Sequence, residues 1–256
     1  MDKTTKTVSI PAGLQLNDPI FLNQFIDEQK RLFVVLQDNA TAMFYEQDHT
    51  EEIVFFLGKQ SRLTFFSLIT KTGTKKIEIV CTGEGAQARV CGFYLLDGHK
   101  KLCLQTKQNH YVQNTKTDLF LRGAVTDSAS VNHRGKIFVE KNAQQAKAVQ
   151  NNKTILLSSG AYVQSCPELQ VLNKNVQCSH GTASGQPDEQ QLFYLCSRGI
   201  PKKIAQRLLL EAFFTLPFAG VDDRSFKKVH SNFFLKNYRR WYEAVAQGFS
   251  NSKRKD

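Results

Sequence analysis

Short runs of aliphatic and aromatic residues alternate with polar turn residues from about Ile10 to Cys178. The runs are rich in Val, Ile and Phe, and each is bounded by Gly, Asn, Asp, Lys or Thr, which is typical of strands separated by turns. The pattern predicts strands at RLFVVLQ (31–37), EIVFFLG (52–58), RLTFFSLI (62–69), KIEIVCTG (76–83), VCGFYLL (90–96), KIFVE (136–140), KTILLSS (153–159), AYVQS (161–165), ELQVLN (168–173) and NVQCS (175–179).

The predicted strands follow one another closely, with almost no helical periodicity between them. This spacing argues against a fold in which strands alternate with helices, and it favours a sandwich, a barrel or a β-solenoid. No strict repeat period emerges, so the pattern alone leaves these three architectures open.

The pattern changes at Pro187. The segment PDEQQLFYLCSRG places Pro187 at a first helical position, acidic residues in the first turn and Gly199 just past the end, which predicts a helix. A second helix is predicted between Pro201 and Pro217, and a third from about Ser225. The third carries an aromatic stripe made of Phe234, Tyr238, Trp241 and Val245. The sequence therefore predicts a β domain over 1–186, with a short N-terminal lead-in, and a helical domain over 187–256.

The chain has 256 residues and a formal net charge of +11, and the charge is unevenly distributed. Residues 201–256 hold 12 Lys or Arg against 5 Asp or Glu, so most of the excess lies at the C-terminal end. No recognised nucleic-acid motif accompanies this charge, so a basic solvated face or partner surface is expected rather than a nucleic-acid site.

The cysteine pattern and the N-terminal residues indicate a cytoplasmic protein. Six cysteines are scattered without a CxxC pair, which is typical of reduced thiols. The N-terminal residues MDKTTKTVSI lack the apolar core of a signal peptide. No apolar run is long enough to span a bilayer, so no membrane partner is expected.

Nucleotide-binding motifs are absent or in the wrong context. GEGAQA (83–88) matches a dinucleotide fingerprint, but the strand RVCGFYLL follows it instead of the helix that would receive a pyrophosphate. A tight turn is the better interpretation. No GxxxxGK[ST] sequence occurs, so any ATP hydrolysis would belong to a partner protein.

Cys178 and His180 are the strongest candidates for chemistry. Residues i and i+2 of a strand face the same side, so the thiol and the imidazole would lie side by side. An imidazolium nearby lowers a thiol pKa, and the thiolate is the form that binds metal. Two ligands do not complete a tetrahedral site, so further ligands would have to come from elsewhere. From the residues alone, a buried structural pair is the alternative, and His110 is interpreted as a hydrogen-bonded structural histidine.

The segment CSHGTASGQPDEQQLFYLCSRGI resembles the C-terminal signature of the SufB/SufD family, the scaffold subunits of the SUF iron–sulfur cluster assembly machine. The resemblance extends back through AQQAKAVQNNKTILLSSGAYVQSCPELQVLNKNVQCSHG and RGAVTDSASVNHRGKIFVEKNAQ, and covers about 8–213. The CSHG form is similar to SufD. A typical SufD also has a helical N-terminal domain, whereas this chain enters the β pattern almost at once.

The resemblance implies a right-handed parallel β-helix over about 8–186, followed by helices. It also implies a non-enzymatic scaffold that pairs through its β-helix with a SufB-like subunit, or with a second copy of itself, and docks a SufC-like ATPase. The expected docking stripe consists of Ala205, Leu208, Leu209, Ala212 and Phe213. Deleting 201–256 is then expected to abolish ATPase binding.

The resemblance places Cys178 and His180 at the subunit interface, where iron, sulfur or a transient cluster is handled with ligands shared by the partner chain. No cofactor is expected in the isolated chain. If the pair handles iron or sulfur, Cys178 is expected to be a low-pKa thiol that alkylates readily in the free subunit and is protected in the complex, whereas a structural pair predicts a thiol inert to alkylation. Two other functions stay open: a cluster-free β-helix binding module, and a carbohydrate-active β-helix enzyme. The enzyme is disfavoured because no carboxylate cluster stands out.

Overall fold

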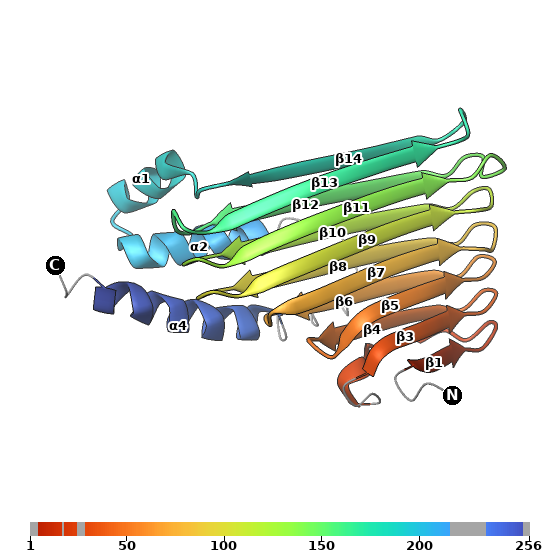
Figure 1. Cartoon of the computed structure of the whole chain (residues 1–256), viewed down its shortest axis with the longest axis horizontal. Coiled ribbons are helices and arrows are strands. Elements are labelled where there is room, and N and C mark those ends of the chain that lie inside the picture. The colour runs from red at the N-terminus through yellow and green to blue at the C-terminus, as the bar shows by residue number, and fades with distance from the viewer. Residues whose placement is uncertain (1–4, 17, 25–28, 216–233, 253–256) are drawn as a thin grey trace.

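The chain forms a β-solenoid of about 6 turns, followed by helices, in a computed structural model that describes residues 5–16, 18–24, 29–215 and 234–252 (Figure 1). Two parallel seven-stranded sheets make up the solenoid. Sheet A has the order β1-β3-β5-β7-β9-β11-β13, and sheet B has the order β14-β12-β10-β8-β6-β4-β2. The chain therefore passes from one sheet to the other at each turn, which confirms the solenoid and excludes the sandwich of antiparallel sheets.

The strands of sheet A are β1 (Thr5–Ile10), β3 (Gln29–Leu36), β5 (Thr50–Leu57), β7 (Gly73–Cys81), β9 (Lys101–His110), β11 (Ser130–Val139) and β13 (Tyr162–Val171). Those of sheet B are β2 (Ile20–Phe21), β4 (Thr41–Gln47), β6 (Arg62–Ile69), β8 (Gln87–Leu96), β10 (Lys116–Val125), β12 (Lys147–Leu156) and β14 (Gln177–Gly185). The helices are η1 (Leu22–Gln24), α1 (Glu189–Ser197), α2 (Lys202–Thr215) and α4 (Leu235–Ser252).

One corner of the solenoid is built from residues in the left-handed backbone region. Asn39, Gln60, Gly85, Asn114 and Gln145 all have φ between 55° and 73°. Each donates its backbone N–H to a carbonyl of the next turn, as in Asn39 to Lys59 (2.6 Å) and Gln145 to Asn175 (2.7 Å). Asn and Gly tolerate this conformation best, so the polar residues between the apolar runs set the sharp corner that reverses the chain.

The interior changes character along the solenoid axis. One inward-facing row of sheet B runs through Phe65, Val90 and Leu119 and then continues as Gln150 and His180. The early turns are thus filled by close-packed apolar side chains, which supply the hydrophobic stabilisation of the fold. The late turns carry buried polar side chains instead.

The C-terminal helices cover part of the outer face of sheet B. Leu210 and Phe214 of α2, with Phe234, Tyr238 and Trp241 at and within α4, form one hydrophobic cluster with outward-facing strand residues. The strand residues in this cluster are Met43, Tyr45, Phe66, Leu68, Cys91, Phe93, Leu95 and Ala124. The aromatic stripe predicted for the third helix is therefore core. Its predicted start near Ser225 lies outside the described residues.

The change from strands to helices falls between Gly185 and Glu189. Pro187 was expected at the first helical position, but the structure places it one residue before the N-cap, Asp188, whose side chain accepts from the N–H groups of Gln190 and Gln191. Gly199, with φ of 86°, ends α1 as predicted. Among the described residues, no helix is long and apolar enough to cross a membrane.

Candidate functional site at the open end of the solenoid

The last turn of the solenoid, β13 and β14, forms its C-terminal end, and each strand is the last of its sheet. The two strands lie together at the upper edge of the solenoid (Figure 1). In contrast to the buried turns beneath them, their inward-facing residues are half-buried or exposed. The end of the core is therefore accessible within the described part of the chain.

Cys178 and His180 are both on β14 and face the interior of the solenoid. Their register partners on β12 are Ala148 and Gln150, both buried in the interior. The predicted same-face geometry is confirmed. No group of three or more His, Cys, Asp or Glu side chains suited to a metal ion occurs among the described residues, so the pair by itself offers only two side chains that could bind a metal.

The surroundings of Cys178 are apolar. Its half-buried side chain packs with Val171 and Val176 against a small cluster that includes Ala146 and Ala148. Partial burial raises the pKa of the Cys178 thiol, and this effect outweighs a hydrogen bond from the backbone of Ala148 that lowers it. The expected low-pKa thiol is therefore wrong for the isolated chain.

A buried hydrogen-bond network lies in the turns beneath the open end. His133 Nδ1 lies 2.9 Å from Ser165 Oγ and 3.1 Å from Asn152 Nδ2, and His133 Nε2 lies 3.1 Å from Thr106 Oγ1. Asn152 Oδ1 also accepts from the Tyr94 hydroxyl at 3.1 Å. Burial lowers the pKa of His133 to about 4, so its ring is neutral at pH 7.

A glutamine pair lies directly beneath His180. Gln108 Nε2 donates to Gln150 Oε1 at 3.5 Å, and both side chains are buried. A Cβ on Gly135 would lie 1.7 Å from Gln150 Nε2, so the absence of a side chain at Gly135 makes room for the amide. The sequence reasoning missed Gln108 and Gln150, because polar residues at interior positions of a strand resemble loop residues in the sequence.

His110 is the structural histidine that the sequence predicted. Its two ring nitrogens lie 2.7 Å from Thr115 Oγ1 and 2.9 Å from Thr117 Oγ1, and the side chain is fully buried. Burial lowers its pKa to about 4. Every polar atom of the ring is used inside the fold, which leaves His110 without a role at the open end.

The predicted docking stripe on α2 divides between core and surface. Ala205 is buried, Leu209 and Phe213 are half-buried, and Leu208 and Ala212 are exposed. The largest exposed apolar side chains near them belong to α1, which has no buried residue: Phe193 is 75% exposed and Tyr194 is 55% exposed. The sequence analysis did not assign α1 to this surface.

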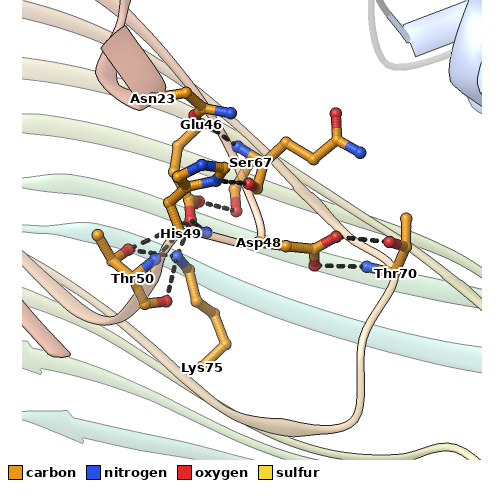
Figure 2. A network of polar contacts seen from close by, with 9 residues as sticks. Asn23, Glu46, Asp48, His49, Thr50, Ser67, Thr70 and Lys75 are labelled. Atoms are coloured by element: carbon orange, nitrogen blue, oxygen red, sulfur yellow. Dashed lines mark hydrogen bonds and ion pairs between the residues drawn. The ribbon is translucent and has the colours of Figure 1, made fainter. Parts of the chain in front are cut away.

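A second polar network lies at a corner between the sheets, far along the axis from Cys178 (Figure 2). Glu46 accepts from Lys75 Nζ (2.7 Å), from Ser67 Oγ (2.9 Å) and from the backbone N–H groups of His49 and Thr50. Burial opposes the charge of Glu46, but Lys75 and these hydrogen bonds hold its pKa below the usual range. All donors of Lys75 have partners, so both buried charges of this ion pair are compensated within the corner.

Comparison with known proteins gives a consistent family assignment. A family profile described as "SUF system FeS cluster assembly, SufBD core domain" matches residues 34–213. An iron–sulfur cluster assembly SufBD family protein of Synechocystis is 32% identical over 80% of this chain and 57% of its own length. The iron–sulfur cluster assembly protein SufD of Plasmodium berghei is 26% identical over 69% of this chain and 13% of its own length. The SufD of Bacillus subtilis is 33% identical over 44% of this chain and 27% of its own length. The chain thus matches less than two thirds of each of these relatives.

Proposed function

Because the chain belongs to the SufBD family of the SUF iron–sulfur cluster assembly system, we propose that it is a SufD-like scaffold subunit without catalytic activity of its own. In this role it pairs with a SufB-like chain and docks a SufC-like ATPase. The six free cysteines are consistent with a cytoplasmic location.

The observation that carries this proposal is the incomplete ligand pair at the open end. Cys178 and His180 share one inward face, and the end of the core around them is accessible. Thiolate and imidazole are ligands that bind iron, and a partner chain at this end would supply the rest. Iron and sulfide are cargo here, so no resident cofactor is assigned to the isolated chain.

The surroundings of the pair suit transient binding. Burial against apolar side chains raises the pKa of the Cys178 thiol. The thiol is therefore mostly protonated until a metal cation displaces its proton. The free energy needed to deprotonate Cys178 therefore makes metal binding weaker there than at an exposed thiolate. A scaffold that hands its cluster on needs such moderate affinity.

Cluster yield after anaerobic co-expression with SufB-like and SufC-like partners tests the proposal. We expect visible absorption from the wild-type complex and loss of most of it in Cys178→Ser and His180→Ala, with unchanged melting temperatures. Cys103→Ser, which changes an exposed thiol on the outer face of sheet A, is the matched control. Full cluster yield in both site variants would indicate the cluster-free binding module instead.

A further inference from the structure

We propose that Arg122 of β10, together with Asn151 and Lys153 of β12, forms a binding site for a doubly charged oxyanion of the phosphate type on the outer face of sheet B. The site lies beside the last turn of α2, whereas Cys178 and His180 face the interior of the solenoid. It is separate from the proposed function, since neither the open end nor a partner chain contributes a residue to it.

Arg122 is a buried cation without a carboxylate partner among the described residues. Its side chain is only 6% exposed. Its own strand and the elements next to it, β8, β12 and α2, contain two acidic residues, Asp118 and Glu211. Both of these form ion pairs with other residues: Asp118 with Arg89 and Lys116, and Glu211 with Arg207 and Arg239. A buried charge is costly unless a counter-charge compensates it.

The hydrogen bonds of Arg122 use only one nitrogen of its guanidinium. Nη1 donates to the backbone oxygens of Leu121 (2.8 Å) and Asn151 (3.3 Å) and to Asn151 Oδ1 (2.8 Å). The guanidinium carbon lies 5.7 Å from the centre of the Phe213 ring. Nε and Nη2 have no hydrogen-bond partner among the described residues, and neither is fully sealed from solvent. These two nitrogens form the planar fork with which arginine binds two oxygens of an anion.

Asn151 and Lys153 add donors on the same outer face. Asn151 accepts from Arg122 through Oδ1, so its Nδ2 is turned toward β14, where a Cβ on Gly181 would lie 3.7 Å from it. Lys153 is exposed and is the register partner of Arg122, and it has no ion-pair partner among the described residues. Like charges directly opposite each other on a sheet repel. A ligand with two negative charges would offset both cations.

The neighbouring side chains leave these donors uncovered. The register partners of Asn151 and Lys153 on β14 are Gly181 and Ala183, which are too small to cover them. Burial lowers the pKa of Arg122, as expected for a cation that is removed from water without a counter-charge. The site therefore offers free hydrogen-bond donors and uncompensated positive charge, which suit an anion.

The number of donors favours a tetrahedral dianion over a carboxylate. A carboxylate would fill the fork of Arg122 and leave the charge of Lys153 uncompensated. A phosphate group has oxygens for the fork and further oxygens for Asn151 Nδ2 and Lys153, and its charge of about −2 matches both cations. The alternative is an arginine that only ties β10 to β12 and to Phe213, and this alternative predicts no anion binding.

Isothermal titration of the full chain with inorganic phosphate tests the site, at constant ionic strength and at a mildly alkaline pH where phosphate is a dianion. We expect saturable binding to the wild type, distinct from the unsaturable stabilisation that phosphate gives to proteins in general. Arg122→Gln should abolish this binding, and Lys153→Gln should weaken it about threefold, the effect of one exposed charge. Lys147→Gln is the matched control and should bind like the wild type, because Lys147 is an exposed lysine on the same face of β12, about 20 Å away.

The source of the phosphate group is distinguished by repeating the titration with sulfate and with ATP. Binding of sulfate with an affinity similar to that of phosphate indicates a site for a small free dianion. Tighter binding of ATP than of phosphate indicates a site for the phosphate group of a nucleotide. Either result supports the site, provided that Arg122→Gln abolishes it.

Asn151→Asp provides a second variant if Arg122→Gln fails to fold. Its carboxylate would take the place of Oδ1, 2.8 Å from Arg122 Nη1, and supply the missing counter-charge from within the chain. We expect a melting temperature above that of the wild type, and phosphate binding weakened at least about tenfold, which corresponds to the loss of one charge-assisted hydrogen bond.

Three outcomes would overturn the inference. The first is a wild-type chain that shows no saturable phosphate binding. The second is binding that is equal in the wild type and in Asn151→Asp, and the third is binding weakened equally by Lys153→Gln and Lys147→Gln. Each of these outcomes leaves the proposed scaffold function standing, because that function is measured separately by cluster yield.

Discussion

At the scale of single residues, glycines decide whether the polar interior can form. Gly123 of β10 faces the interior, where a Cβ would lie 1.8 Å from the ring of Tyr94. That ring is fully buried, and its hydroxyl is fixed by two hydrogen bonds: it donates to Asn152 Oδ1 and accepts from Thr154 Oγ1. A rigid, doubly anchored ring cannot move aside cheaply.

We therefore expect Gly123→Ala to lower the free energy of unfolding by about 2–3 kcal/mol, as overpacked cores do. Gly181→Ala is the control, because a Cβ there would meet only Asn151 Nδ2 at 3.7 Å. Chemical denaturation of both variants measures the difference. Equal stability of the two would contradict the assigned position of the Tyr94 ring.

The two buried histidines predict how stability depends on pH. Burial lowers the pKa of both His110 and His133 to about 4, below the ordinary value of 6.5. Protonation then favours the unfolded chain. Their contribution is fully present above about pH 6.5 and is lost as pH falls toward 4, at up to about 3 kcal/mol for each histidine.

Denaturation midpoints between pH 7 and pH 4 measure this loss. Replacing His133 with Gln keeps hydrogen-bonding groups without a titrating ring, so we expect the variant to be less sensitive to pH than the wild type. His99→Gln, which changes a turn residue on the surface of the solenoid, is the control. An unchanged pH slope in His133→Gln would show that other groups dominate acid unfolding.

At the scale of elements, the exposed face of α1 and α2 is the part of the helices that the solenoid leaves uncovered. Phe193 and Tyr194 project from α1, and Ile204 and Leu208 project from α2. The two helices contact each other, and large exposed apolar side chains on adjoining helices are typical of a partner surface. The proposed ATPase contact is therefore centred on these four residues, not on the buried Ala205.

We expect the double variant Phe193→Ser and Leu208→Ser to weaken ATPase binding at least about tenfold without changing the melting temperature. Substitution is preferred to deletion of 201–256, because deletion would remove Phe214 and Trp241 and uncover the outer face of sheet B. Tyr162→Ser, on β13 and 59% exposed, is the control. Binding lost equally in the control would point to a contact elsewhere.

Strands were predicted correctly from the sequence where the residues that face the interior are apolar. Arg62–Ile69 was predicted at its observed bounds because five of its eight residues are Leu, Phe or Ile and turn residues flank it. β9 and β10 were missed, because interior positions such as Thr106, Gln108 and Thr117 are polar and resemble loop residues. β1 and β4 were also absent from the predicted strands. β13 was predicted as two strands, because Pro167 falls in its middle and the sequence does not show that this residue faces a free edge.

The candidate site was predictable only in part, for a physical reason. Strand alternation correctly placed Cys178 and His180 on one face. The pKa of Cys178 depends on burial against residues such as Val171 and Ala148, which are distant in sequence and approach Cys178 only in the folded solenoid. The neighbouring His180 in the sequence suggested that the pKa of Cys178 would be lowered, whereas burial raises it.

At the scale of the whole molecule, an apolar core at one end supports a polar, accessible core at the other. The early turns hold most of the fully buried apolar side chains, and the late turns hold the network around His133. Stability therefore comes mainly from turns far from the proposed interface. This arrangement lets the end carry exposed and unpaired groups without unfolding the chain.

The cysteines along the solenoid differ in exposure and in thiol pKa, so their reactivity can be used to test this arrangement of buried and accessible turns. Cys103 and Cys166 are exposed, Cys178 is half-buried with a raised pKa, and Cys81 and Cys91 are fully buried, with pKa values raised to about 12 by burial. Because the thiolate is the reactive form, alkylation rates follow exposure and pKa together.

We expect Cys103 and Cys166 to alkylate first in the folded chain, Cys178 more slowly with a rate that rises with pH, and Cys81 and Cys91 only after unfolding. Mass spectrometry of the labelled protein over time measures the order. Binding of the SufB-like chain should then protect Cys178 further, because the proposed partner covers the open end, while Cys103 on the outer face keeps its rate. If Cys178 alkylates as fast as Cys103 in the free chain, the described burial of Cys178 against apolar side chains is wrong. If Cys178 alkylates at the same rate in the free chain and in the complex, the partner binds away from the open end.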